Sequence, residues 1–230
     1  MKKPVFYTEA AYVVGLLLLA LGTALTVFGE FGVSMVVAPA YILHLKLSQY
    51  LPFFSFGMAE YVLQALILAV MLLVLGKGKW TWLLSFVTAV LYSLALDVGC
   101  RLTALLPQTL FLRIVLYILG VLMCTMGLAL QFHTYLPPAA YELFVKVLAH
   151  RYSWKVYVVK TVYDCTSCLL ATGLSFLLLG RLEGVWIGTV VCALIYGLLI
   201  RLSTKLLERI WVFRDRFSLR PKFEESEEKL

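Results

Sequence analysis

Six long runs of apolar residues dominate this chain, and short polar stretches separate them. Each run is continuous and long enough to cross the roughly 30 Å hydrocarbon core of a bilayer. Backbone groups that face lipid must be hydrogen-bonded within their own segment, so continuous runs predict transmembrane α-helices. A β-barrel would need alternating apolar and polar positions, which these runs lack. The expected spans are approximately 11–29, 57–76, 80–98, 110–130, 156–179 and 184–203.

Two further stretches are apolar but interrupted, and each follows the first span of one half of the chain. Residues 31–55 contain Pro39 and Pro52, and residues 132–155 contain Pro137-Pro138 together with several charged residues. Because proline removes a hydrogen-bond donor and breaks a helix, we expect each stretch to form an interfacial or re-entrant helix. The alternative is that both stretches cross the membrane fully, which gives eight spans.

The pattern of the first half recurs in the second half, about one hundred residues later. The segment 22–26 (GTALT) recurs as 127–131 (GLALQ), and Leu75-Gly76 before a lysine recurs as Leu179-Gly180 before an arginine. Three spans per half is an odd number, so the second copy must enter the membrane in the opposite direction. The sequence therefore predicts an all-α integral membrane fold of about six transmembrane helices, arranged as two inverted three-helix repeats.

We expect three regions in the chain: a first membrane repeat over 1–105, a second over 106–203, and a charged tail over 204–230. The tail begins with a mixture of charged and apolar residues (KLLERIWVFR from Lys205), which predicts an amphipathic helix on the inner membrane surface. Residues 204–220 are therefore a candidate docking surface for a protein partner. The acidic residues that follow predict a disordered end.

Composition and charge agree with a membrane protein. The chain has 230 residues, of which 62% are hydrophobic and 14% charged, with a mean hydropathy of +0.93. A soluble domain is closer to half apolar and one quarter charged. The net charge of +7 lies mainly outside the apolar runs, which is typical of contact with anionic lipid headgroups. No nucleic-acid-binding motif is present, so we expect a lipid bilayer and no nucleic acid as the partner.

The distribution of lysine and arginine predicts the orientation of the chain. With six spans and a cytoplasmic N-terminus, fifteen of these residues fall in cytoplasmic segments and four in exported segments. Cytoplasmic segments carry the excess of basic residues, so both termini should be cytoplasmic, in a multi-pass protein of a bacterial inner membrane. Eight spans would export Lys77 and Lys79, so the charge distribution favours six.

Ionisable residues inside apolar spans are costly and point to functional sites. Asp164 follows Lys160 by four residues, so the two side chains share a helix face and can pair. A structural ion pair and a proton- or cation-sensitive site both agree with this spacing. An offset of 104 residues places Glu60 over Asp164, so the two halves would carry related acidic positions. The candidate substrate- or ion-binding residues are Glu60, Gln64, Asp97, Lys160, Asp164 and Glu183.

Enzyme signatures are absent from the sequence. There is no HExxH, GxSxG or P-loop motif, so we expect no enzymatic activity, no cofactor and no metal site. Cys165 and Cys168 form a CxxC pattern within an apolar run, without a second pair of ligands. We interpret them as two small side chains on one helix face.

Four motifs resemble the YczE/YitT-like family of bacterial membrane proteins. They are Gly22-x-x-Leu25, Phe56-Gly57, Lys160-x-x-x-Asp164, and the stretch from Leu182 to Thr189, within a resemblance that covers roughly residues 12–203. The resemblance implies a polytopic protein of the bacterial inner membrane. It also adds weight to Lys160, Asp164, Glu183, Gly184, Gly188 and Thr189, and it implies little about activity.

These observations lead to two functional hypotheses. The first is a small secondary transporter or permease for a small molecule or ion, with its site between the inverted repeats. The second is a non-transporting accessory or scaffold protein of the membrane, with its partner bound at 204–220. The sequence leaves both open.

Overall fold

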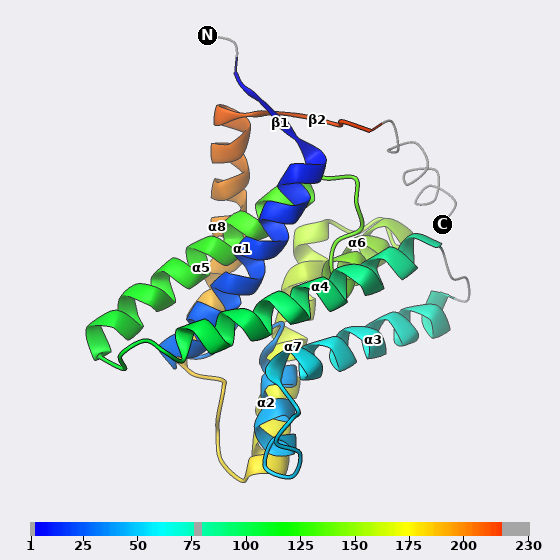
Figure 1. The fold of residues 1–230 in the computed structure, drawn as a ribbon. Helices are drawn as coiled ribbons and strands as arrows, with labels where there is room; N and C mark the ends of the chain where they lie inside the picture. The colour runs from blue at the N-terminus through cyan, green and yellow to red at the C-terminus, as the bar shows by residue number, and fades with distance from the viewer. Residues whose placement is uncertain (1–2, 76–79, 218–230) are drawn as a thin grey trace.

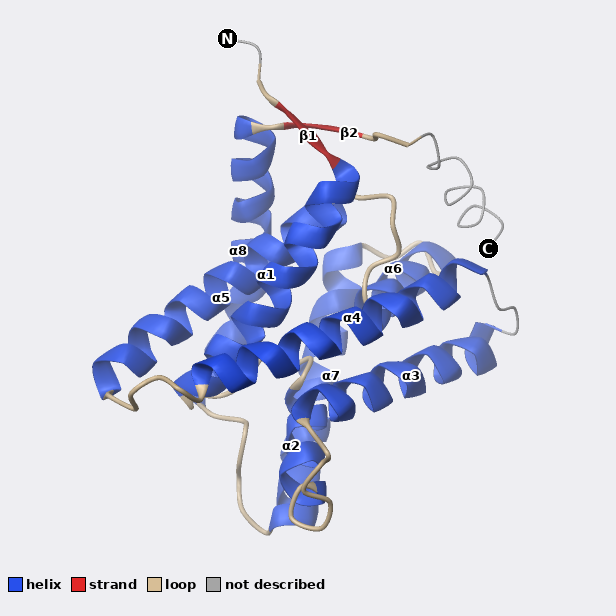
Figure 2. Ribbon diagram, in the orientation of Figure 1, coloured by secondary structure: helices blue, strands red, loops and turns tan. Residues whose placement is uncertain are grey.

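The computed structural model describes residues 3–75 and 80–217, and this part of the chain is mostly helical (Figures 1 and 2). A short strand lies at each end. The elements are β1 (Val5–Tyr7), α1 (Thr8–Gly29), α2 (Ala38–Leu47), α3 (Phe56–Leu75), α4 (Trp80–Thr103), α5 (Leu110–Phe132), α6 (Ala140–Arg151), α7 (Val156–Leu179), α8 (Ile187–Ile210) and β2 (Val212–Arg214).

Six of the described helices are long and apolar enough to cross a membrane, namely α1, α3, α4, α5, α7 and α8. This confirms the predicted all-α fold with about six spans, and the chain is a multi-pass membrane protein. The two interrupted stretches form α2 and α6, which have 10 and 12 residues. A helix rises about 1.5 Å per residue, so neither is long enough to cross the hydrocarbon core, and eight full spans are not formed.

Close contact between α1 and α5 is made possible by glycines. A Cβ atom added at Gly22 would lie 2.7 Å from the carbonyl oxygen of Gly120, and one added at Gly15 would lie 2.8 Å from that of Gly127. The reciprocal distances are 2.7 Å and 2.6 Å. Because contacts advance along α1 while they retreat along α5, the two helices are antiparallel. We refer to these four residues as the glycine seam.

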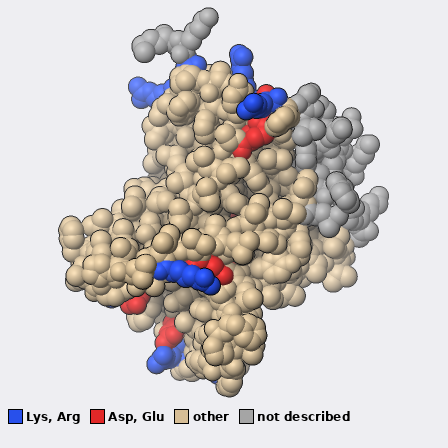
Figure 3. Space-filling view, in the orientation of Figure 1, with Lys and Arg blue, Asp and Glu red and all other residues tan. Residues whose placement is uncertain are grey.

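The remaining helices are arranged around α1 and α5. α4 packs on α1, and α8 packs on α5; α2 packs on α7, and α6 packs on α3 (Figure 1). Each short helix therefore contacts a long helix of the other half of the sequence. In the view of Figure 3, charged side chains form a few isolated clusters on a surface that is otherwise uncharged.

The tail differs from its prediction. Residues from Lys205 do not begin a separate amphipathic helix, because α8 continues through them to Ile210 and no residue there interrupts its hydrogen bonding. The chain then becomes extended, and β2 pairs with β1 in parallel, with Val5 opposite Val212. This pairing fixes both described ends to one side of the molecule, as an even number of spans requires. The predicted acidic end lies outside the described residues.

Candidate functional site

The first turn of α6 binds a buried polar pair on α3. Glu60 and Gln64 lie one turn apart and are fully buried, and Gln64 Nε2 donates to Glu60 Oε2 at 3.5 Å. The Tyr141 hydroxyl also donates to Glu60 Oε2. The backbone N–H of Ala140 donates to Gln64 Oε1 at 3.3 Å. The sequence-predicted residues Glu60 and Gln64 are thus in contact, and together they anchor the N-terminal end of α6.

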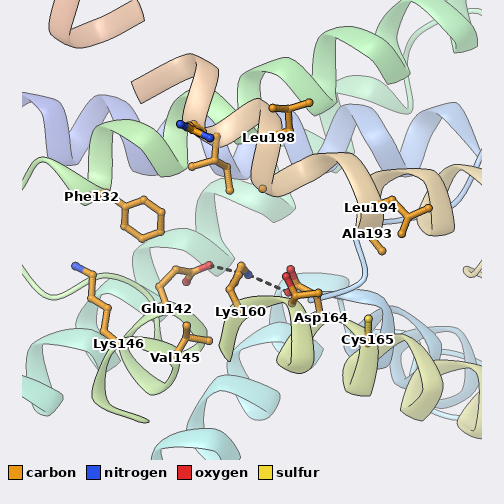
Figure 4. Close-up of a pocket in the computed structure, with 14 residues that line it drawn as sticks. Phe132, Glu142, Val145, Lys146, Lys160, Asp164, Cys165, Ala193, Leu194 and Leu198 are labelled. Carbon is orange, nitrogen blue, oxygen red and sulfur yellow. Dashed lines mark ion pairs between the residues drawn. The ribbon is translucent and has the colours of Figure 1, made fainter. Parts of the chain in front are cut away.

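The next residue of α6, Glu142, faces the second predicted pair. Lys160 Nζ lies 3.0 Å from Asp164 Oδ1, one turn along α7, and 4.0 Å from Glu142 Oε1 (Figure 4). All three side chains are almost completely buried. Burial raises the pKa of the Glu142 carboxyl above its ordinary value, and the charge of Lys160 opposes that shift. α6 therefore joins the two predicted pairs into one cluster, which we call the central cluster: Glu60, Gln64, Tyr141, Glu142, Lys160 and Asp164.

The central cluster has more carboxyl groups than its ammonium group can neutralise. The cluster has three carboxyl groups, those of Glu60, Glu142 and Asp164, and one basic residue, Lys160, which pairs with Glu142 and Asp164. Glu60 Oε1 and Glu142 Oε2 are buried, and neither has a hydrogen-bond partner among the described residues. Unpaired charge is strongly unfavourable in a low-dielectric interior. The cluster can lower this excess of negative charge by binding a proton or a cation.

A cavity of about 800 Å³ opens beside the central cluster. Glu142, Lys160 and Asp164 form a row along one wall, and apolar residues of α8 face them (Figure 4). Volume and lining are typical of a small-molecule site, in which an apolar wall surrounds a few polar groups. The lining residues are Phe132, Glu142, Val145, Lys146, Lys160, Thr161, Asp164, Cys165, Ala193, Leu194, Gly197, Leu198, Ile200 and Arg201.

Two smaller spaces are bordered by residues of α1. A space of about 20 Å³, which is enough for one water molecule, is bordered by Glu142 and Lys160 and by Leu19 and Thr23 of α1. Farther along α1, Val27 and Glu30 border a cavity of about 460 Å³. The 800 Å³ cavity and the 20 Å³ space share Glu142 and Lys160, so the central cluster borders both. We call the 800 Å³ and 460 Å³ spaces the large and the small cavity.

Asp97 lies apart from the central cluster and holds the start of α3. Its carboxylate accepts hydrogen bonds from Ser55 Oγ at 2.5 Å and from the backbone N–H of Gly57 at 2.7 Å. Arg113, the first arginine after this helix pair, does not contact Asp97 and pairs with Glu30 at 2.6 Å. The geometry of Asp97 is that of a structural cap.

Glu183 also lies outside the central cluster. It pairs with Arg181 at 2.5 Å and borders the small cavity. Its neighbours fasten the loop before α8 to the segment after α1: Thr189 Oγ1 donates to the carbonyl of Val33 at 2.8 Å, and Val33 N–H donates to the carbonyl of Gly184 at 3.0 Å. Gly184 has a φ of +74°, which favours glycine.

Sequence reasoning did not select Glu142 or Tyr141 as site residues, although both lie at the centre. One signal was available. Glu142 is the one acidic residue in the interrupted stretch 132–155, and it follows Pro137-Pro138 closely, at the start of a helix. Among the described residues, no group of three or more His, Cys, Asp or Glu is arranged to hold a metal ion.

The residues that form this site lie within a region that matches a known protein family. A family model matches residues 6–205, which is most of the chain. The chain belongs to DUF6198, a family of unknown function. No curated protein and no solved structure matches it. The DUF6198 region contains the whole central cluster and both cavities, whereas β2 lies beyond its end. The match supports a membrane family without an assigned activity, and it does not specifically support the YczE/YitT-like assignment.

Proposed function

We propose that this DUF6198 protein is a small secondary transporter or permease, with its site between two inverted repeats. The observation that carries the proposal is the central cluster: buried carboxyl groups in excess of one lysine, at the border of the large cavity and of the 20 Å³ space beside it. Ionisable groups at such a depth commonly mark ion or substrate pathways. The bacterial inner membrane, the cytoplasmic location of both termini and the YczE/YitT-like relationship are parts of this proposal.

Helix contacts support the inverted repeat. If α1 is exchanged with α5, α2 with α6, α3 with α7 and α4 with α8, the contacts α1–α4 and α5–α8 correspond, as do α2–α7 and α6–α3. The glycine seam agrees with this exchange, because Gly15 and Gly22 have the same spacing as Gly120 and Gly127. Two equivalent antiparallel helices in contact are the arrangement expected across an axis in the membrane plane.

The central cluster suggests how binding and movement are coupled. Lys160 is shared between Asp164, on its own helix, and Glu142, on α6. Protonation of Glu142, or a cation beside it, removes the attraction that links α6 to α7 through Lys160. α6 remains attached to α3 through Glu60, so it can move with α3 and away from α7. Rocking of the halves would then close the large cavity and open the small one.

The scaffold hypothesis is less well supported by the tail. The backbone N–H groups of Arg216 and Phe217 donate to the Glu9 carboxylate at 3.0–3.2 Å, and Thr8 Oγ1 donates to Asp215 at 2.8 Å. Part of the segment that would receive a partner is thus occupied by the protein's own N-terminus. We therefore favour the transporter.

Proteoliposomes that contain an internal pH indicator test the proposal. We expect at least one compound from a panel of small metabolites and ions to drive proton movement through the wild-type protein. Asp164→Asn should abolish that coupling in a folded protein, whereas Glu208→Gln, at an exposed residue outside both cavities, should retain it. Equal rates in Asp164→Asn and wild type, or no proton movement with any compound, would overturn the proposal.

A further inference from the structure

The large cavity contains a buried acceptor without a donor. Glu142 is 4% exposed and borders the cavity, and its Oε2 atom has no hydrogen-bond partner among the described residues. Its other oxygen lies 4.0 Å from Lys160, which is closer to Asp164. A carboxylate can only accept hydrogen bonds, so a ligand group that completes this site must be a donor, and an ammonium group is the donor that also supplies the opposite charge.

The same cavity is bordered by a basic group without an anionic partner. The Arg201 side chain borders it from α8 and makes no ion pair or hydrogen bond within the described part of the chain. Lys146, one turn after Glu142 on α6, also borders the cavity, with its Nζ over the ring of Phe132 at 5.5 Å from the centroid. Guanidinium and ammonium groups bind carboxylate or phosphate through charge-assisted hydrogen bonds. An amine without an anionic group would leave Arg201 unmatched.

The third feature is an apolar wall with free space. Ala193, Leu194 and Leu198 of α8 face the charged row (Figure 4). Gly197 lies in the same wall, and a Cβ atom added there would have no other atom within 4 Å. The volume of about 800 Å³ is larger than an inorganic ion requires and is within the range of small-molecule sites.

We infer that the large cavity binds a zwitterion with an apolar body, of the size of an amino acid or a dipeptide. Its ammonium group would lie against Glu142 and Asp164, its anionic group against Arg201 and Lys146, and its apolar part along α8. That the zwitterion is the transported substrate rests on the proposed function. That the cavity binds a zwitterion rests only on the cavity and its lining residues. A proton on Glu142 would compete with the ammonium group, so binding should weaken in acid.

Five probes test the inference by the melting temperature of the detergent-purified full chain. Leucine, phenylalanine and leucyl-leucine carry both charges, while 3-methylbutylamine and 4-methylpentanoate keep the apolar body of leucine with one charge each. We expect at least one zwitterion to raise the melting temperature, and the single-charge compounds to bind at least tenfold more weakly. No shift with any zwitterion, or equal binding of the amine, would overturn the inference.

Matched variants locate the site. Gly197→Phe should fill the cavity and abolish the shift, whereas Gly173→Phe should retain it, because a Cβ at Gly173 also meets no atom within 4 Å but lies outside the cavity. Glu142→Gln and Arg201→Gln should each weaken binding at least tenfold. An unchanged shift in folded Gly197→Phe would contradict the assignment.

Further outcomes distinguish a lipid ligand from a soluble metabolite, and ligand binding from transport. A short-chain phosphatidylethanolamine has the same paired charges, and if it alone raises the melting temperature, the ligand is a lipid and the metabolite-sized substrate is wrong. Binding of a zwitterion without transport in proteoliposomes would overturn the proposed function and leave the site intact. Proton-coupled transport in a protein that binds the amine alone would overturn only this inference.

Discussion

At the scale of residues, the main feature of the central cluster is one lysine, Lys160, that pairs with carboxylates from two helices, α6 and α7. Lys160 and Asp164 could be paired from their spacing alone, because residues four apart share a helix face. Glu142 could not be added in that way, since its proximity depends on how α6 lies against α7. Glu60 and Gln64 were selected as candidates, but their partners Tyr141 and Ala140 are 81 and 76 residues away in the sequence. Contacts of that range depend on tertiary structure and carry no local signal.

Replacing Lys160 with methionine should destabilise the protein, because it leaves buried carboxylates without a counter-charge. Loss of one partner of a buried ion pair typically costs roughly 3–5 kcal/mol. The deficit should be larger at the alkaline end of the range, where Glu142 carries more negative charge, and should shrink as the pH falls through the raised pKa of that carboxyl. Thermal unfolding of Lys160→Met and wild type between pH 5 and 8 measures both effects. A pH-independent deficit would contradict this account.

At the scale of elements, hydrophobic pattern predicted the helices well and their ends less well. The span expected at 184–203 begins at Ile187 and continues to Ile210, because the loop before it is held by Gly184 and Thr189 and nothing interrupts the helix afterwards. α4 likewise extends past its expected end to Thr103, since the charge of Asp97 is satisfied by Ser55 and Gly57. A polar residue near the end of a helix makes the sequence there less apolar, but the helix continues when residues from elsewhere in the fold bind that side chain.

The positions of close helix contact at glycines could also be predicted only in part from the sequence. Small residues within membrane spans commonly permit close helix packing, and the expected spans contain Gly22, Gly127, Gly173, Gly188 and Gly197. Gly22 and Gly127 lie in the glycine seam, and a Cβ at Gly188 would lie 2.3 Å from the carbonyl of Phe31. The expectation is wrong for Gly173 and Gly197, which face open space. Composition identifies small residues, but only the helix face that each occupies decides whether a neighbour is close.

Gly22→Leu should weaken the contact between α1 and α5, because its Cβ would lie 2.7 Å from backbone and side-chain atoms of α5. Inserting extra carbon atoms into a close-packed contact costs about 1–3 kcal/mol, and more when backbone must move. The matched control is Gly173→Leu, which should stay within about 0.5 kcal/mol of wild type as exposed substitutions usually do. Thermal unfolding in detergent compares the two, and equal stability of the two variants would contradict the antiparallel seam.

At the scale of the whole molecule, alternating access requires that the large cavity, which borders the central cluster, and the small cavity open in turn. The internal repeat and the odd number of spans per half suggested this arrangement from sequence. The cavities themselves could not be predicted, because they are spaces left between side chains of several helices and loops. Their volumes are about 800 Å³ and 460 Å³.

The central claim is tested most directly by cysteine labelling with a membrane-impermeant maleimide. Cys165 borders the large cavity, and Leu45 borders the small one, so the protein with Cys165 as its one cysteine is compared with a Cys165→Ser, Leu45→Cys protein. On acidification, which protonates Glu142, we expect labelling of Cys165 to slow while labelling at position 45 accelerates. Rates that do not change, or that rise and fall together, would contradict alternating access.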